Sequence, residues 1–368
     1  MSFEKVDKRD LYRCVSCGNC RSVCPAFEQT GRESKNTRGR ILVIRDVYEG
    51  NLADESVFDS INTCTTCGYC AVSCPAGVHP PDLVEGARSG LVASGKMTPV
   101  QMKIRDTVAQ YANTLGDSGP RLGWLEGSGL AVPENPKAVY FVGCLDTYRY
   151  PGTALHSYRI LNKMGVGLLE DEKCCASPLL RLGFTNEADV LIKHNINQIK
   201  KSGADTIIAG CAGCFNTLKN NYGSDLDGIS VVTVSEYLIS HLDDLKKAGL
   251  SKLNLKITYH DPCHSGRHND IYDEPRALIR EIVGKDNFIE MATIREKSRC
   301  CGGGGGVRSG YNDLSLAMAK RRLEDVPAGI DYIVTTCPLC LRNLRDAGGD
   351  VPAIDLIELV SMAGNQDC

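Results

Sequence analysis

Eight cysteines in the first hundred residues form two copies of one motif. In each copy the cysteines follow at intervals of three, three and four residues, and a proline comes directly after the last one, at Pro25 and Pro75. Three thiolates this close together can hold one [4Fe-4S] cubane, while the fourth ligates the cubane of the other copy. Zinc, the alternative, prefers separated pairs of cysteines. The spacing therefore predicts two cubane sites, Cys14, Cys17, Cys20 and Cys74 for one and Cys64, Cys67, Cys70 and Cys24 for the other.

Ten further cysteines form a second repeat with five in each copy. A single cysteine, an adjacent pair and a C-x-x-C pair occur in that order, and four of the five recur after 126 residues. Because a structural zinc or a cubane uses four thiolates, the fifth indicates an unusual polynuclear cluster; a four-cysteine cluster with a spare thiol is the alternative. The copies are Cys144, Cys174, Cys175, Cys211 and Cys214, then Cys263, Cys300, Cys301, Cys337 and Cys340. The nineteenth cysteine, Cys368, is the last residue and is interpreted as incidental.

Hydrophobic periodicity indicates which elements position these cysteines. Helical spacing over residues 38–48 and 57–64 predicts an all-helical ferredoxin domain. In each later copy a β-branched strand precedes the first cysteine and another, such as 206–209, precedes the C-x-x-C pair, with a helix such as 188–199 between them. Alternating strands and helices predict parallel sheets, whose carboxyl ends gather ligands. The predicted class is α+β, with an all-helical domain (1–95), a linker containing a helix (96–136) and two pseudo-symmetric α/β domains with parallel sheets (137–245 and 246–368).

The composition excludes several other classes of protein. The 42 Lys and Arg residues and 45 Asp and Glu residues are interspersed, which does not favour nucleic-acid binding. No apolar run approaches the roughly 18 to 20 residues of a membrane span, and the chain does not open with the pattern of a secretory signal. In a reducing compartment this many cysteines indicate metal rather than disulfides. We therefore expect a cytoplasmic metalloprotein.

The combined cysteine pattern resembles that of the D-type subunits of heterodisulfide reductase. The two sets of five are similar to the duplicated CCG cysteine-rich domain, here following a ferredoxin with two cubanes, and the resemblance extends from Leu11 to Leu359. Gly302 conforms to the motif, whereas Ala176 replaces the corresponding glycine of the first copy. The resemblance implies that each set of five binds a noncubane [4Fe-4S] cluster, and that these ten cysteines are catalytic.

The family's activity implies a substrate and a redox partner. The resemblance implies an oxidoreductase of methanogenesis that reduces the mixed disulfide of coenzyme M and coenzyme B to two thiols, with electrons relayed through the cubanes. The donor would be a membrane b-type cytochrome or a flavin-bearing subunit, with the chain cytoplasmic, either free or peripheral on the cytoplasmic membrane face. No G-x-G-x-x-G follows a strand, so no nicotinamide or flavin is expected in this chain. The alternative is a non-catalytic electron-transfer subunit of a glycolate, lactate or glycerol 3-phosphate dehydrogenase; two complete sets of five favour the reductase.

Four other residues are candidates for contacts with the clusters or the anionic substrate. Arg181 and Arg308 occupy nearly equivalent positions in the two copies and can bind anions, or serve only solubility. Gly302 opens a run of five glycines that would let a ligand lie against bare backbone, with a flexible turn as the alternative. Of three histidines near Cys263 (His260, His264 and His268), His264 is preferred as a hydrogen-bond donor to cluster sulfur, the alternative being a structural histidine.

Overall fold

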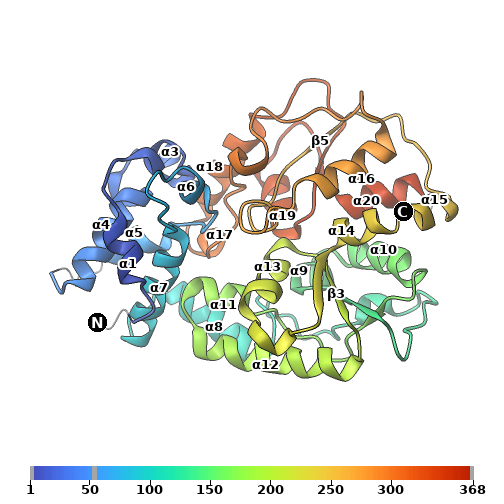
Figure 1. Cartoon of the computed structure of the whole chain (residues 1–368), viewed down its shortest axis with the longest axis horizontal. Helices are drawn as coiled ribbons and strands as arrows, with labels where there is room; N and C mark the ends of the chain where they lie inside the picture. Colours follow the sequence, from blue (N-terminus) through green and yellow to red (C-terminus); the bar gives the residue numbers. More distant parts are fainter. Residues whose placement is uncertain (1–3, 52–55, 365–368) are drawn as a thin grey trace.

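The amino-terminal helices form a separate layer at one end of the molecule (Figure 1). The computed structural model describes residues 4–51 and 56–364, and its described residues up to Tyr111 contain helices and no strand. Leu11, Ile44 and Ile61 are fully buried in the core of this layer. The helices are α1 (Lys8–Arg13), α2 (Asn19–Ser22), α3 (Pro25–Thr30), α4 (Thr37–Tyr48), α5 (Ser56–Asn62), α6 (Tyr69–Val72) and α7 (Pro80–Ala93), with the 3-10 helix η1 (Glu33–Lys35). The next helix, α8 (Pro99–Tyr111), packs against the first α/β unit.

The first α/β unit is built on a sheet with four parallel strands in the order β2-β1-β3-β4. Val139 pairs with Ile207, which pairs in turn with Val231. The strands are β1 (Ala138–Phe141), β2 (Gly167–Leu168), β3 (Thr206–Ala209) and β4 (Ser230–Thr233). The helices are α9 (Cys144–Tyr148), α10 (Pro151–Asn162), α11 (Ser177–Leu182), α12 (Thr185–Ser202), α13 (Ala212–Asn221), α14 (Val234–Ser240) and α15 (Leu242–Lys247), with 3-10 helices η2 (Gly123–Leu125) and η3 (Gly223–Leu226).

The second α/β unit repeats this plan with a smaller sheet, ordered β5-β6-β7 and again parallel. A single bridge between Ile257 and Phe288 stands where the first unit has β2. The strands are β5 (Ile257–Tyr259), β6 (Tyr332–Thr335) and β7 (Ala353–Asp355), and the helices are α16 (Asp273–Val283), η4 (Arg295–Lys297), α17 (Val307–Gly310), α18 (Asn312–Leu323), α19 (Pro338–Ala347) and α20 (Leu356–Ala363). The predicted α+β class and parallel sheets are confirmed.

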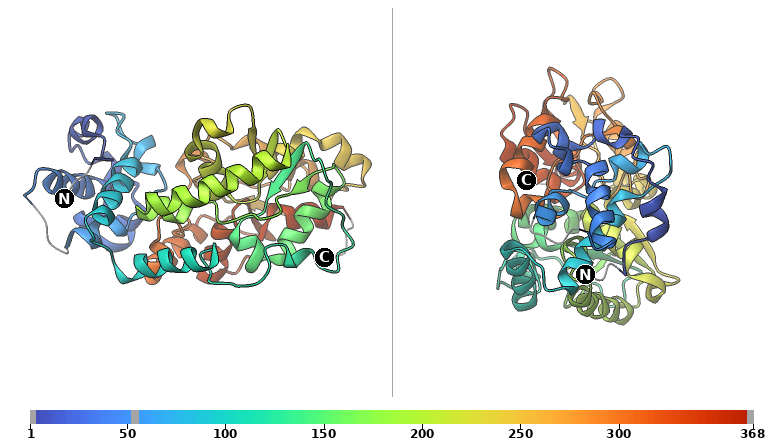
Figure 2. Two further views of the ribbon diagram at one scale, coloured as in Figure 1. Left: turned by 90° about the horizontal axis from the view of Figure 1, so that it is seen from below. Right: turned by 90° about the vertical axis from the view of Figure 1, so that its left-hand side faces the viewer.

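The two α/β units share one hydrophobic core. Tyr140 and Tyr158 of the first unit belong to the same buried cluster as Tyr259 and Leu278 of the second, and α10, α14, α16 and α20 lie between the two sheets (Figure 1). The outer face of the first sheet is covered by α12 and by α8, whose Val108 joins that core. Figure 2 shows the helical layer capping one end of this pair. No helix in the described ranges combines the length and apolar character needed to cross a bilayer.

Two carboxylates are buried where the α/β units meet. Asp146 and Asp355 are 2% and 8% exposed and line one cavity, and Oδ1 of Asp146 has no hydrogen-bond partner among the described residues. Burial raises the pKa of Asp355 to about 8, although its carboxylate also caps α20 by accepting the Ile357 N–H at 2.9 Å. The carboxyl group therefore favours its protonated form in the folded chain.

This carboxyl group predicts a pH-dependent stability. Because the folded pKa lies above the unfolded one, its contribution is complete below pH ~4 and is lost as the pH rises to about 8. Asp355→Asn keeps a good helix cap without a charge. The stability of the variant relative to that of the unchanged protein should therefore be higher at pH 8.5 than at pH 5. Thermal unfolding midpoints at the two pH values measure this; equal differences at both would contradict it.

Candidate metal centres

The first predicted set of four cysteines surrounds a cavity in the helical layer. Cys14, Cys17 and Cys20 line it from the first motif, and Cys70 and Cys74 line it from the second, in an open space of ≈380 Å³. Cys20 lies in α2, which begins after Gly18 in the left-handed conformation (φ 89°). The cavity therefore combines cysteines of both motifs, and Cys70, which was predicted for the second set, borders this cavity and the second one.

The second predicted set of four surrounds a matching cavity of ≈320 Å³. Cys64, Cys67 and Cys70 come from the second motif, and Cys24, which precedes α3, comes from the first. Arg40 is buried beside this site and donates to the Cys24 sulfur at 3.6 Å. Its position on α4, between the two motifs, carries no sequence signal for this role, and sequence reasoning missed it.

The environment of these thiols suits an iron–sulfur cluster. Burial raises the pKa of Cys20 to about 11 and that of Cys70 well above its ordinary value, so a thiolate here requires a bound cation. Backbone N–H groups already point at two sulfurs, from Thr66 to Cys64 and from Val78 to Cys74, each at 3.4 Å. Such donors support cluster thiolates. The residues therefore fit the cubanes that their spacing predicts.

The ten later cysteines meet around one central cavity between the two α/β units. Four of them follow the carboxyl ends of β1, β3, β5 and β6 within four residues, and the open space has a volume of ≈1360 Å³. Cys301 and Cys340 have their sulfurs 3.1 Å apart. Nine of the ten line the cavity: Cys144, Cys174, Cys175, Cys211, Cys214, Cys263, Cys301, Cys337 and Cys340.

The two sets of five touch each other, and one of them touches the helical layer. Cys211 of the first set and Cys337 of the second interact within one buried cluster. Cys300, the cysteine that does not line the cavity, interacts with Cys67 and donates to the Thr65 hydroxyl at 3.6 Å. The second cubane site and the second set of five are therefore direct neighbours.

The glycine run at residues 302–306 allows the second cubane site and the second set of five to lie this close together. A β-carbon at Gly304 would lie 2.7 Å from the Thr65 carbonyl oxygen, and one at Gly305 would lie 2.3 Å from that of Cys64. Gly303 to Gly306 also line the central cavity. Bare backbone thus allows the loop to pack against the second cubane site while it forms a wall of the cavity.

The two predicted arginines both line the central cavity and are already engaged. Arg181 pairs with Glu85 of α7 and donates to Asn221 at 3.2 Å, while Arg308 donates to Asn343 at 2.9 Å and pairs with Asp346. Arg342 lines the same cavity and was missed from the sequence, where nothing marks it. The cavity therefore has three arginines, with partners of opposite charge at Glu85 and Asp346.

The three histidines occupy different places. His264 lines the central cavity with Nδ1 3.5 Å from the Cys263 sulfur and stacks on His268 at 4.9 Å between ring centroids. His268 bonds through Nε2 to the Thr66 carbonyl oxygen at 3.0 Å and so joins the second unit to the helical layer. His260 lies behind the cavity wall near Cys301.

The departure at Ala176 has a local explanation. Ala176 adopts a left-handed conformation (φ 69°), as Gly302 does (φ 82°). At Gly302 a β-carbon would also lie 2.4 Å from the Ser315 carbonyl oxygen, whereas Ala176 is accommodated in full burial. The glycine of the motif is thus required by packing only in the second copy.

Two family models match the chain. Residues 10–78 match the 4Fe-4S dicluster domain, and residues 138–219 and 257–345 match the cysteine-rich domain. The chain is therefore an iron–sulfur protein, with one model matching twice as the internal repeat predicted.

Proteins similar to this chain include oxidoreductases and oxidoreductase subunits. The D subunit of the dihydromethanophenazine:CoB–CoM heterodisulfide reductase of Methanosarcina mazei is 34% identical over 97% of this chain and 95% of its own length. The B subunit of the fumarate reductase (CoM/CoB) of Methanothermobacter marburgensis is 31% identical over 98% of this chain and 74% of its own. The EtfAB:quinone oxidoreductase of Syntrophomonas wolfei is 28% identical over 92% and 55%.

The contrast between Ala176 and Gly302 predicts opposite responses to matched substitutions. Gly302→Ala should cost roughly 1 to 3 kcal/mol, because it adds left-handed strain to a backbone clash, and iron content should fall with it. Ala176→Gly should change stability by less than about 1 kcal/mol and leave iron content unchanged. Iron analysis and thermal unfolding of both variants test this. A similar loss in both would contradict the packing explanation.

Proposed function

The chain belongs to the family of D-type heterodisulfide reductase subunits, and on that premise we propose that it is a catalytic iron–sulfur protein that reduces a disulfide to two thiols. The reaction consumes R–S–S–R′, two electrons and two protons and releases R–SH and R′–SH. The mixed disulfide of coenzyme M and coenzyme B is the proposed substrate, as named for the Methanosarcina relatives. The observation that carries the proposal is one open cavity lined by cysteines of both complete sets of five.

Four clusters are proposed, two cubanes in the helical layer and two noncubane [4Fe-4S] clusters at the central cavity. When bound, the clusters supply electrons singly, so that two of them at one cavity meet the two-electron requirement of a disulfide. The cysteines of each proposed site are the two sets of four and the two sets of five given above. The contact of Cys300 with Cys67 supports a junction between the two parts of the chain at the second set.

The other residues of the cavity are suited to hold an anionic disulfide. Arg181, Arg308 and Arg342 provide positive charge for the acidic groups of the substrate. Leu115 and Leu339 provide apolar wall, which limits access of water to the sulfur atoms. His264 can donate a hydrogen bond to a product thiolate beside Cys263, while Gly303 to Gly306 let the substrate approach the backbone.

A redox partner subunit is proposed to deliver the electrons to the exposed end of the helical layer. Cys17 of the first cubane site is exposed, and its neighbour Val15 is 71% exposed. The relatives are named as subunits of larger oxidoreductases, which supports a partner that is either a membrane b-type cytochrome or a flavin-bearing subunit. The proposed location is the cytoplasm, either free or peripheral at the membrane face.

A second candidate is an electron-transfer subunit without its own substrate. The carboxylates of Glu85 and Asp346 neutralise much of the charge of Arg181 and Arg308, and the similarity to the EtfAB:quinone oxidoreductase points the same way. Turnover by the isolated protein with an artificial electron donor distinguishes the two candidates, because only the reductase releases thiols.

Cys300→Ser tests the catalytic proposal, with Cys368→Ser as a matched control outside both repeats. The iron-loaded protein should reduce the coenzyme disulfide with a reduced viologen dye. Cys300→Ser should lose about four irons and more than roughly 100-fold of the rate, while cubane signals persist. Thiol release measured anaerobically is the readout. A fully iron-loaded protein that releases no thiols, or unchanged turnover in Cys300→Ser, would reject the proposal.

Arg308→Gln tests substrate binding, with Arg280→Gln as the matched control. Arg280 lies on α16 with its side chain 43% exposed and does not line the cavity. Loss of one charge-assisted hydrogen bond should raise KM about tenfold, which corresponds to ~1.4 kcal/mol, with kcat changed less than about twofold. Steady-state kinetics of both variants provide the measurement. Equal KM values in the two variants would show that Arg308 does not bind the disulfide.

A further inference from the structure

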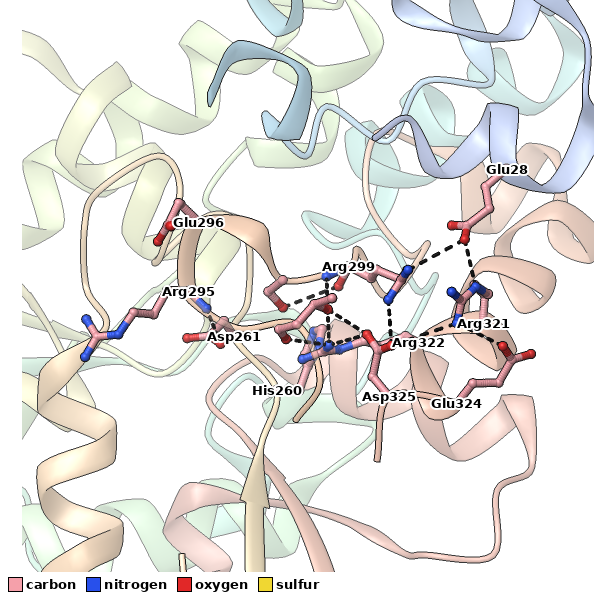
Figure 3. A network of polar contacts seen from close by, with 12 residues as sticks. Glu28, His260, Asp261, Arg295, Glu296, Arg299, Arg321, Arg322, Glu324 and Asp325 are labelled. Carbon is pink, nitrogen blue, oxygen red and sulfur yellow. Dashed lines mark hydrogen bonds and ion pairs between the residues drawn. The ribbon is translucent and has the colours of Figure 1, made fainter. Parts of the chain in front are cut away.

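His260 lies at one end of a network of polar side chains that extends to Glu28 (Figure 3). Its side chain is 1% exposed, and one of its ring nitrogens lies within 4.8 Å of the sulfurs of both Cys301 and Cys340. His260 directly follows β5, and its backbone is hydrogen-bonded to β6. Its N–H donates to the Val334 carbonyl at 2.9 Å, and its carbonyl accepts from the Thr335 hydroxyl at 3.3 Å. The imidazole is therefore rigidly placed behind these sulfurs.

An arginine decides which nitrogen of this ring carries the proton. Nε of Arg322 donates to Nδ1 of His260 at 3.0 Å. Because a guanidinium group has donors and no acceptor, Nδ1 must accept and the proton of the neutral ring is on Nε2. Nε2 of His260 is buried and has no hydrogen-bond partner among the described residues. Nε2 is therefore left as a buried N–H donor without a partner in the described part of the chain, on a ring that has one nitrogen within 4.8 Å of the sulfurs of both Cys301 and Cys340.

A carboxylate holds Arg322 in this position. Arg322 is fully buried and donates to Asp325 at 2.8 Å and to the Thr293 carbonyl at 2.8 Å. Asp325 also accepts from Arg299 at 2.6 Å and from the Thr293 hydroxyl at 2.6 Å. Burial opposes its ionisation, yet these bonds hold the pKa of Asp325 below its ordinary value. The ionised carboxylate keeps the arginine oriented toward His260.

The same network of polar side chains reaches the helical layer through Glu28 of α3. Arg321 donates from Nε to Glu28 at 2.7 Å, and Arg299 lies 3.7 Å from the same oxygen (Figure 3). Glu28 follows Cys24 of the second cubane site by four residues. The charges that hold Arg322 therefore also take part in docking the helical layer.

The first copy has no counterpart to this histidine. Phe141 precedes Cys144 by three residues, as His260 precedes Cys263, and it is fully buried without a hydrogen-bond donor in its side chain. The first set of five has an arginine instead: Arg121, from the segment before β1, interacts with Cys144. The two sets of five are thus equal in cysteines and unequal in their surroundings.

We propose that His260 is a positioning residue that donates an Nε2–H hydrogen bond to a thiolate sulfur of the second cluster, and that Arg322 and Asp325 fix its tautomer for this purpose. The inference rests on the proposed function only in assigning a cluster to the second set of five. Hydrogen bonds to cluster sulfur stabilise the more negative, reduced state and raise the reduction potential. The second cluster, which adjoins the second cubane site, therefore accepts electrons more readily than its cysteines alone would allow.

Replacement of His260 by the first copy's residue tests this directly. Anaerobic redox titration by electron paramagnetic resonance, without disulfide, should show one noncubane signal at lower potential in His260→Phe, with the other cluster signals unchanged. The expected shift is roughly tenfold in the one-electron equilibrium, about 59 mV. Arg322→Gln, which retains the imidazole but frees its tautomer, should move the same signal in the same direction. His194→Phe, on α12 and outside the cavity lining, should move none.

Two further readouts separate the possible roles of His260. His260→Asn retains an N–H donor and should lie between the unchanged protein and His260→Phe in potential. If both His260 variants lose about four irons, the ring is a ligand and the inference is overturned. If only His260→Phe loses iron, the reduction potential of the noncubane signal in Arg322→Gln is the deciding measurement. A potential equal to that of the unchanged protein overturns the inference. The titration contains no disulfide, so a protein that does not reduce the disulfide can still show the shift in potential. A protein that reduces the disulfide but shows no shift in His260→Phe rejects this inference and leaves the proposed function intact.

Discussion

A thiolate inside a protein needs positive charge beside it, and this requirement governs the whole molecule. All eighteen motif cysteines are in the described part of the chain, and nine of them are buried. Burial raises the pKa of Cys20 and Cys70, which would leave these two thiols protonated and unable to ligate. Iron supplies the missing charge, and N–H donors such as that of Arg40 to Cys24 supply the rest. Folding and cluster binding are therefore linked.

Placement of the sites then follows from ordinary features of the fold. Parallel strands bring Cys144 and Cys211 to one edge of a sheet, and the repeat brings a second edge opposite the first. Bare backbone at Gly304 and Gly305 lets the helical layer approach the second set of five. Buried Arg88 closes the same junction by donating to the Arg181 carbonyl at 2.7 Å and to the Cys64 carbonyl at 2.8 Å. One junction thus joins the two kinds of site.

Much of this arrangement could be predicted from the sequence, because metal ligands and strand ends have fixed local spacing. The two cubane sets, the repeat of five and the strand at 206–209 required no tertiary information. The roles of Arg40, Arg342 and His260 did, since each depends on a contact between residues far apart in the chain. The sequence favoured His264 as the sulfur-bonding histidine; the structure puts its ring beside Cys263 and also places His260 behind Cys301. The ranges assigned to the domains and the roles assigned to the site residues stay predictions, and Cys368 lies outside the described residues.

Electron paramagnetic resonance of the oxidised, iron-loaded protein with and without the coenzyme disulfide tests whether the clusters at the central cavity react with the substrate. We expect about sixteen irons per chain, four for each of four clusters, and a new paramagnetic signal that appears when the disulfide is added and is absent from Cys300→Ser. A protein with the same iron content whose spectrum does not change on addition of the disulfide would contradict a catalytic role for the central cavity.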